Sequence, residues 1–278
     1  MVLRQIAKKI LSKNPSFYSA VHTLKFEQQH KQDFSPYSEN EKNLLEKINK
    51  HGFVIIPDFF DANLCKSCID DMNSMFENHP EFLQKNEDLR IFGAEELSEN
   101  IKKFSNQELL NNLANAYNGV PTVCGFTLAG KINDSSQEYG SGGPWHRDSY
   151  FRQFKSMIYL NDVDEKNGPF QLITDSHIPK IKIVDKKKFK LDEMQSLFNQ
   201  NIVDKILDDD PDRLKTITGK AGTLLLLDTS IIHRGMPVKS GTRYALTNYF
   251  FEKTQINSHL IEHFSPLVSP EKVLSLGN

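Results

Sequence analysis

The spacing of hydrophobic residues changes near residue 121. Before it, apolar positions recur every three or four residues, as in helices that bury one face. After it, short apolar or alternating runs follow one another, and clusters of Gly, Pro, Asn, Asp and Ser separate them: TVCGFTLAGKI, FKSMIYLNDV, PFQLIT, TLLLLD and RYALTNYFF. Several short strands at this spacing are typical of a sandwich or a closed barrel rather than of βαβ units. The sequence therefore predicts a mainly β protein with flanking helices, folded as a jelly roll.

The amino-terminal part is predicted to be largely helical. Ser38 and Glu41 form a capping box in front of an apolar helical face. That helix is expected to stop at Gly52, where the short strand FVIIPDFF begins. Further helices are expected over about residues 63–78 and within residues 94–117.

The same patterns suggest how the chain is organised. Residues 1–36 are interpreted as a helical extension and residues 37–278 as one domain, with a mostly helical insertion at about residues 179–212. Residues 1–13 place basic side chains around an apolar stripe. Such a helix either packs on its own domain or lies on a membrane surface, and packing is the commoner case.

Composition and charge exclude several classes of protein. A formal net charge of −2 gives no electrostatic footprint for nucleic acid. No apolar run is long enough to span a membrane, and the first residues lack the apolar core of a secretory signal. Three cysteines cannot make a disulfide framework, so a cytoplasmic location is expected, with Cys65 and Cys68 as small buried side chains.

The first candidate chemistry lies in GSGGPWHRDSYF. In a strand, His146 and Asp148 are two residues apart and point to the same face. An imidazole and a carboxylate, joined by a second imidazole from elsewhere, make up the two-His-one-carboxylate triad of non-haem Fe(II) oxygenases. By itself an HxD pair is weak evidence, because such short patterns arise by chance.

The segment GTLLLLDTSIIHRGMPVKSGTRYALTNYFF strengthens this hypothesis. Two apolar runs lead to His233, and a turn rich in Gly, Pro and Ser precedes another strand. If the flanking strands pair as a hairpin about Val238, Arg243 lies opposite His233. A guanidinium there can bind a carboxylate through two charge-assisted hydrogen bonds. We therefore predict that His146, Asp148 and His233 bind the metal and that Arg243 binds 2-oxoglutarate.

From His51 onward the chain resembles the phytanoyl-CoA dioxygenase-like family of Fe(II)- and 2-oxoglutarate-dependent oxygenases. The resemblance rests on GFVIIPDFFD, on WHRD at 145–148, on YLNDVDEKNGPFQLITDSH at 159–177 and on HRG…R at 233–243. It implies a double-stranded β-helix, which is a cupin-like barrel. It also implies iron ligands and a 2-oxoglutarate arginine at the four positions named above.

Two departures from the family pattern affect the cosubstrate site. Asp175 stands where many members have a glycine, and Gly235 stands where some have a hydroxyl-bearing residue. The second departure leaves part of the 2-oxoglutarate contact unassigned. Lys131, which shares a strand face with Thr127, is a candidate for that contact, and an exposed lysine at a strand end is the alternative.

The predicted insertion contains a run of lysines, PKIKIVDKKKFK. A charge run is usually a solvated surface. An insertion at the mouth of a barrel could instead bind an anionic or carrier-linked substrate, because loops there often carry specificity. Both interpretations stay open from the sequence.

The predicted reaction uses Fe(II), 2-oxoglutarate and O2 to hydroxylate a C–H bond of a small molecule or conjugated metabolite. Because Asp148 keeps a carboxylate at the metal, hydroxylation is favoured over halogenation. One alternative is a metal-dependent cupin-type isomerase or epimerase, which needs neither oxygen nor Arg243. Another is a non-catalytic binding barrel. The sequence does not identify the substrate.

Overall fold

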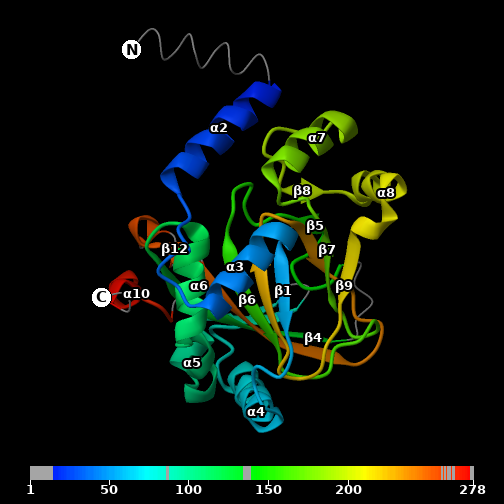
Figure 1. Ribbon diagram of the computed structural model, residues 1–278. Helices are drawn as coiled ribbons and strands as arrows, with labels where there is room; N and C mark the ends of the chain where they lie inside the picture. The colour runs from blue at the N-terminus through cyan, green and yellow to red at the C-terminus, as the bar shows by residue number, and fades with distance from the viewer. Residues whose placement is uncertain are drawn as a thin grey trace.

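Two antiparallel β-sheets pack against each other, and helices cover the outer face of the larger sheet in the computed structural model (Figure 1). The structure describes residues 15–85, 88–133, 139–257, 259, 261, 264 and 267–275. The basic stripe of residues 1–13 lies outside the described residues. Among the described residues, no helix has the length and apolar character to cross a membrane.

The larger sheet has seven strands in the order β1-β10-β6-β12-β4-β3-β2, and the smaller has five in the order β8-β5-β11-β7-β9. The strands are β1 (Phe53–Ile56), β2 (Gln84–Lys85), β3 (Leu89–Phe92), β4 (Thr122–Asn133), β5 (Trp145–His146), β6 (Phe154–Tyr159), β7 (Phe170–Ile173), β8 (Leu197–Phe198), β9 (Leu214–Ile217), β10 (Leu224–Asp228), β11 (Ile232–Gly235) and β12 (Thr242–Glu252). Two facing sheets of this kind confirm the predicted jelly roll, or double-stranded β-helix.

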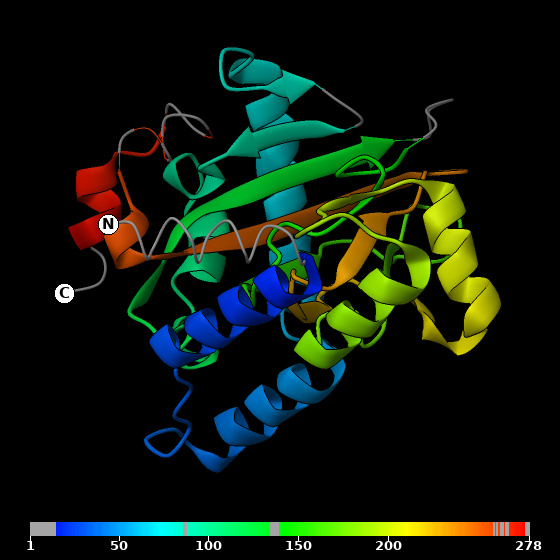
Figure 2. The same ribbon diagram turned by 90° about the horizontal axis from the view of Figure 1, so that it is seen from above.

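The helices precede the sheets, interrupt them and follow them. They are α2 (Pro15–Gln29), α3 (Glu39–His51), α4 (Ala62–Asn78), α5 (Glu99–Ser105), α6 (Glu108–Asn118), α7 (Pro179–Phe189), α8 (Gln200–Asp209) and α10 (Pro270–Ser275). Short 3-10 turns are η1 (Ala94–Glu96), η2 (Pro211–Arg213) and η3 (Lys253–Gln255). Helices α3, α5 and α6 pack on the larger sheet, whereas α2 lies beside α7 (Figure 2).

The first predicted helix forms as its capping residues require. The Ser38 side chain accepts a hydrogen bond from the Glu41 N–H, and the Glu41 carboxylate accepts one from the Ser38 N–H at 2.8 Å. The helix ends at Gly52, whose φ of 80° is left-handed and favours glycine. Local sequence alone therefore determined both ends of α3.

Strand β10 shows why this fold needs continuous apolar runs. Leu224 and Leu226 face the helices, and Leu225 and Leu227 face the smaller sheet. All four side chains are almost completely buried. A strand with both faces buried reads as an unbroken hydrophobic segment, which is what TLLLLD is.

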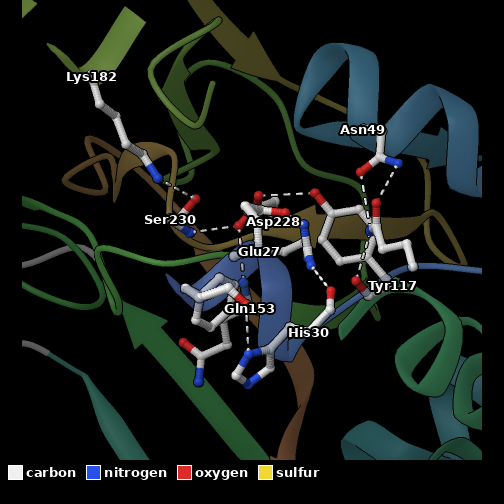
Figure 3. Close-up of polar contacts among 11 residues, drawn as sticks. Glu27, His30, Asn49, Tyr117, Gln153, Lys182, Asp228 and Ser230 are labelled. Atoms are coloured by element: carbon white, nitrogen blue, oxygen red, sulfur yellow. Dashed lines mark hydrogen bonds and ion pairs between the residues drawn. The ribbon is translucent and has the colours of Figure 1, made fainter. Parts of the chain in front are cut away.

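The lysine run is not a uniform solvated surface. It lies on α7, where Lys186 pairs with Glu193 and Lys188 with Asp209. Lys182 instead points inward and is only 5% exposed. Its ammonium donates to the Tyr150 carbonyl at 2.6 Å and to the Ser230 hydroxyl at 3.0 Å (Figure 3). Burial lowers the pKa of Lys182 to about 7.

This buried lysine should make stability depend on pH. Between pH of about 7 and 10.5 the folded protein holds Lys182 neutral while the unfolded chain keeps it charged. The unfolded state then binds the extra proton, so the free energy of unfolding rises with pH, by up to about 1.4 kcal/mol per pH unit. Denaturant unfolding of wild type and Lys182→Met across this range would measure the difference.

The matched control is Lys180→Met, which removes an exposed lysine from the same helix. The free energy of unfolding should rise with pH equally in wild type and in this control, whereas it should not show this rise in Lys182→Met. Parallel curves for all three proteins would contradict a neutral Lys182.

Candidate metal centre and cosubstrate pocket

A pocket of about 190 Å³ opens between the two sheets. The larger sheet contributes residues of β3, β4, β6, β10 and β12, and the smaller contributes residues of β5, β7 and β11. Its polar lining includes His146, Asp148, His233 and Arg243, all four of the residues predicted to act together.

The two histidines are cross-strand neighbours. His233 on β11 pairs directly with His146 on β5, and the ring centroids are 4.4 Å apart. The Asp148 carboxylate lies 3.7 Å from the Nε2 of His146 and 3.9 Å from the Nε2 of His233. One ligand atom from each residue falls within 4.8 Å of the others, and the described residues contain no other such group of three. Two imidazoles and one carboxylate at this separation are a donor set that fits a divalent transition metal.

Both imidazoles are oriented for metal binding. The Nδ1 of His146 lies 2.8 Å from the Pro144 carbonyl, and the Nδ1 of His233 lies 2.9 Å from the Ile231 carbonyl. A carbonyl oxygen only accepts hydrogen bonds, so each Nδ1 carries the proton and each Nε2 keeps a free lone pair. Burial, followed by the nearby His146, lowers the pKa of His233 to about 4, so His233 is neutral at physiological pH.

The strand predicted for the HxD pair is shorter than expected. Strand β5 contains only Trp145 and His146, so Asp148 lies beyond it. Backbone hydrogen bonds replace the strand there: Arg147 N–H donates to the Ser196 carbonyl at 2.7 Å and Asp148 N–H to the Thr229 carbonyl at 3.1 Å. These bonds hold the carboxylate beside both imidazoles without a regular ladder.

A buried lysine next to Asp148 was missed in the sequence. Lys155 on β6 is 6% exposed, and its ammonium lies 2.9 Å from the Asp148 carboxylate and 3.6 Å from the centre of the Tyr249 ring. Burial raises the pKa of Asp148, but the charge of Lys155, the two neighbouring histidines and the hydrogen bond from Lys155 together outweigh burial and hold that pKa below its usual range. A single lysine inside the apolar run FKSMIY was the only available signal.

The prediction that His233 and Arg243 lie opposite each other on a hairpin was wrong, because their strands belong to different sheets. Strand β11 lies in the smaller sheet between β5 and β7, whereas β12 lies in the larger sheet between β6 and β4. Arg243 pairs with Ile132 rather than with His233. The two strands meet across the gap between the sheets, so both side chains still line one pocket. The Arg243 guanidinium is 4% exposed and donates to the Gly168 carbonyl.

Lys131 and Thr127 lie on the opposite face of the larger sheet. The Lys131 ammonium donates to the Asn73 side chain on α4 at 3.0 Å. The Thr127 hydroxyl donates to Asn248 at 2.7 Å, and Asn248 in turn donates to the Phe104 carbonyl on α5. Neither residue is among those that line the pocket, so the structure does not bring them to the predicted cosubstrate contact.

Other residues occupy the space near Arg243. A Cβ at Gly235 would lie 2.6 Å from the Ser141 carbonyl, so no larger residue fits there. Ser141 itself lines the pocket, and its hydroxyl donates to Asp88 at 2.5 Å. Arg90 also lines the pocket and pairs with Asp88 at 2.5 Å. Ser141 and Arg90 are thus alternatives to the hydroxyl that Gly235 lacks.

Asp175 adopts a φ of 64°, the left-handed conformation that glycine favours and that Asp tolerates. The departure from the family pattern at this position is therefore a turn variation. It does not reach the pocket.

A second buried polar cluster supports the loops that carry the ligands. The Asp228 carboxylate accepts from the Tyr117 hydroxyl at 2.9 Å, from Ser230 N–H at 2.9 Å and from Gln153 N–H at 3.2 Å (Figure 3). Asp228 ends β10, just before the turn that leads to His233. None of the six lysines of α7 and its cap lines the metal pocket, so the structure favours a supporting role for this insertion.

Comparisons with known proteins agree with this geometry. The chain matches the family model described as phytanoyl-CoA dioxygenase (PhyH) over residues 48–245. The protein therefore belongs to the phytanoyl-CoA dioxygenase family, as its motifs predicted. A search of curated protein sequences found no match.

Solved structures share the fold at low sequence identity. EctD from S. alaskensis, in its apoform, is 15% identical with a TM-score of 0.59 over 79% of this chain and 78% of its own. The non-heme alpha ketoglutarate dependent epimerase SnoN from nogalamycin biosynthesis is 13% identical with a TM-score of 0.56 over 77% of this chain and 84% of its own. HygX from Streptomyces hygroscopicus, with nickel and 2-oxoglutarate bound, is 14% identical with a TM-score of 0.53 over 75% and 86%.

Replacing any member of the triad should weaken metal binding. His146→Ala, Asp148→Ala and His233→Ala each remove one of three converging ligand atoms, and none is part of the hydrophobic core. We expect a loss of at least about tenfold in Mn(II) or Fe(II) affinity by anaerobic calorimetric titration, with an unchanged circular dichroism spectrum. Wild-type affinity in all three variants would remove the triad as the metal site.

Proposed function

We propose that the protein is an Fe(II)- and 2-oxoglutarate-dependent hydroxylase that acts on a C–H bond of a small molecule. The observation that carries this proposal is the convergence of the His146, Asp148 and His233 ligand atoms in one pocket with the buried Arg243. Membership of the phytanoyl-CoA dioxygenase family supports it independently. A binding barrel without catalysis would need neither a neutral His233 aimed at a metal nor a buried guanidinium beside it.

Each group in the pocket has a role in this reaction. The iron and 2-oxoglutarate, when bound, supply the oxidation with O2, and 2-oxoglutarate leaves as succinate and carbon dioxide. Arg243 binds the distal carboxylate of 2-oxoglutarate, and Ser141 and Arg90, which line the same pocket, are candidates for further contacts to it. The apolar side chains of Met157, Phe170 and Leu227 line the remaining wall. Such a wall limits water near the reacting atoms.

One finding favours a second candidate outcome. SnoN is described as an alpha ketoglutarate dependent epimerase, so this fold also serves proteins with that reaction. A 2-oxoglutarate-dependent epimerase would consume oxygen and release succinate, as a hydroxylase does. An isomerase of the oxygen-independent kind would do neither, and the buried Arg243 gives it no advantage.

The identity of the product separates these outcomes. A hydroxylase adds one oxygen atom to its substrate for each succinate, and mass spectrometry under ¹⁸O2 would find that label in the product. An epimerase would release succinate and return a product of unchanged mass. Turnover of substrate without oxygen and without succinate would contradict both and leave the cupin-type isomerase.

Arg243→Ala should separate cosubstrate binding from metal binding. The guanidinium contacts the distal carboxylate and not the metal, so Mn(II) affinity should stay close to wild type. Loss of one partner of a buried charge pair should weaken 2-oxoglutarate binding by about 2–5 kcal/mol in calorimetric titrations of the Mn(II) enzyme.

The matched control is Lys131→Ala, which removes a cation from the neighbouring strand on the opposite sheet face. This control should bind 2-oxoglutarate as wild type does. Equal 2-oxoglutarate affinity in Arg243→Ala and wild type would show that another residue holds the distal carboxylate.

A further inference from the structure

The pocket contains more positive charge than its own acids balance. Arg90, Lys155 and Arg243 are cationic residues of its lining, and the two carboxylates that meet them are Asp88, paired with Arg90, and Asp148, paired with Lys155. Three positive charges thus face two negative ones. Arg243 is the cation that forms no ion pair among the described residues, and its guanidinium donates to the Gly168 carbonyl instead.

Binding of the metal and the cosubstrate does not change this balance. This step rests on the proposed function. A divalent metal adds two positive charges and the 2-oxoglutarate dianion adds two negative ones, so the pair is neutral. The distal carboxylate of 2-oxoglutarate then balances the charge of Arg243, and Asp148 helps to balance the charge of the metal. The positive charge that remains unbalanced is that of Lys155. A buried charge without compensation is costly, and a bound anion would remove that cost.

Lys155 also has the geometry to bind a further group. Its ammonium carries three N–H donors, and the described residues use two of them, one for the Asp148 carboxylate and one for a side-chain hydrogen bond to Tyr249, whose ring the ammonium also contacts. It lines the pocket from β6, next to Met157 and Tyr249. One donor therefore remains for a molecule in the pocket, within reach of the metal ligand Asp148.

From this charge balance and geometry we infer that the substrate carries an anionic group, a carboxylate or a phosphoryl group, and that Lys155 binds it beside the metal. Lys155 thereby determines which part of the substrate lies at the metal. The lysines of α7, which the sequence offered as an anion site, do not line this pocket.

Paramagnetic relaxation can test this without the natural substrate. The probes are acetate and methyl phosphate, and the protein is the full chain with Mn(II) and saturating 2-oxoglutarate. Mn(II) shortens the relaxation time of probe protons held nearby. We expect the methyl protons of at least one probe to relax faster in wild type. The probe with the larger Lys155-dependent effect identifies the anionic group.

Lys155→Gln removes the charge but keeps an N–H donor for Asp148. In this variant the affinity of the responding probe should fall about tenfold, the loss of one charged contact. Mn(II) should still bind this variant, because all three candidate ligand side chains remain, and 2-oxoglutarate affinity should fall far less than in Arg243→Ala. Lys131→Gln, a lysine on the opposite sheet face, is the matched control and should behave as wild type.

Three results would overturn the inference. The first is probe relaxation that is absent or that persists equally in Lys155→Gln. The second is a loss of 2-oxoglutarate affinity in Lys155→Gln as large as in Arg243→Ala, which would assign Lys155 to the cosubstrate. The third is loss of Mn(II) binding in both Lys155→Gln and Lys155→Met with the fold intact, which would make Lys155 a positioning residue for Asp148. Failure of the wild type to bind Mn(II) or 2-oxoglutarate would instead contradict the proposed function.

Discussion

The pairing of β5 with β11 is the contact on which the candidate site depends. It places His146 opposite His233, and a slip of one residue would turn either side chain to the other sheet face. Strand β11 is well supported, because β7 pairs with all four of its residues. Strand β5 has only two residues, and its other edge is covered by β8, which belongs to the insertion between α7 and α8. The insertion thus pairs with the strand that presents the candidate metal ligand His146.

Electrostatics constrain the same region. Several cations are buried around a carboxylate that a metal would also need, so the pocket holds a high positive potential in a poorly solvated space. The negative charge of Asp88 balances the positive charge of Arg90, and that of Asp148 balances the charge of Lys155. Anionic ligands are favoured by this arrangement, and a dianionic cosubstrate is the first of them. The protein keeps these charges in place by strand pairing rather than by flexible loops, since Lys155 and Arg243 both lie on central strands of the larger sheet.

Much of this could be predicted from the sequence. Short alternating and apolar runs predicted the jelly roll, and a capping box predicted the start of α3. The positions of His146, Asp148 and His233 predicted that their side chains would lie together. The pattern could not tell which sheet each strand would join, because the turn after β11 crosses from one sheet to the other. The predicted hairpin was therefore wrong, although Arg243 still lines the same pocket as His233. When both faces of a strand are buried, alternation also cannot tell the pocket face from the helix face, so Lys131 was assigned to the wrong side and Lys155 was overlooked.

The amino-terminal helix α2 bears on the site through the loop that follows Asp148. Arg152 in that loop pairs with Glu27 at 2.8 Å and donates to the His30 carbonyl at 2.5 Å, and the Phe26 and Phe151 rings stack with centroids 4.6 Å apart. Next to it, Gln153 N–H donates to the Asp228 carboxylate at 3.2 Å, and the Gln153 carbonyl accepts from Thr229 N–H at 2.8 Å, so the loop is held from both sides. Helix α2 lies far from this loop in sequence, yet these contacts hold the loop that follows the candidate metal ligand Asp148. Its packing therefore restricts the positions that the loop after Asp148 can take, so the described part of the amino-terminal segment supports the candidate site.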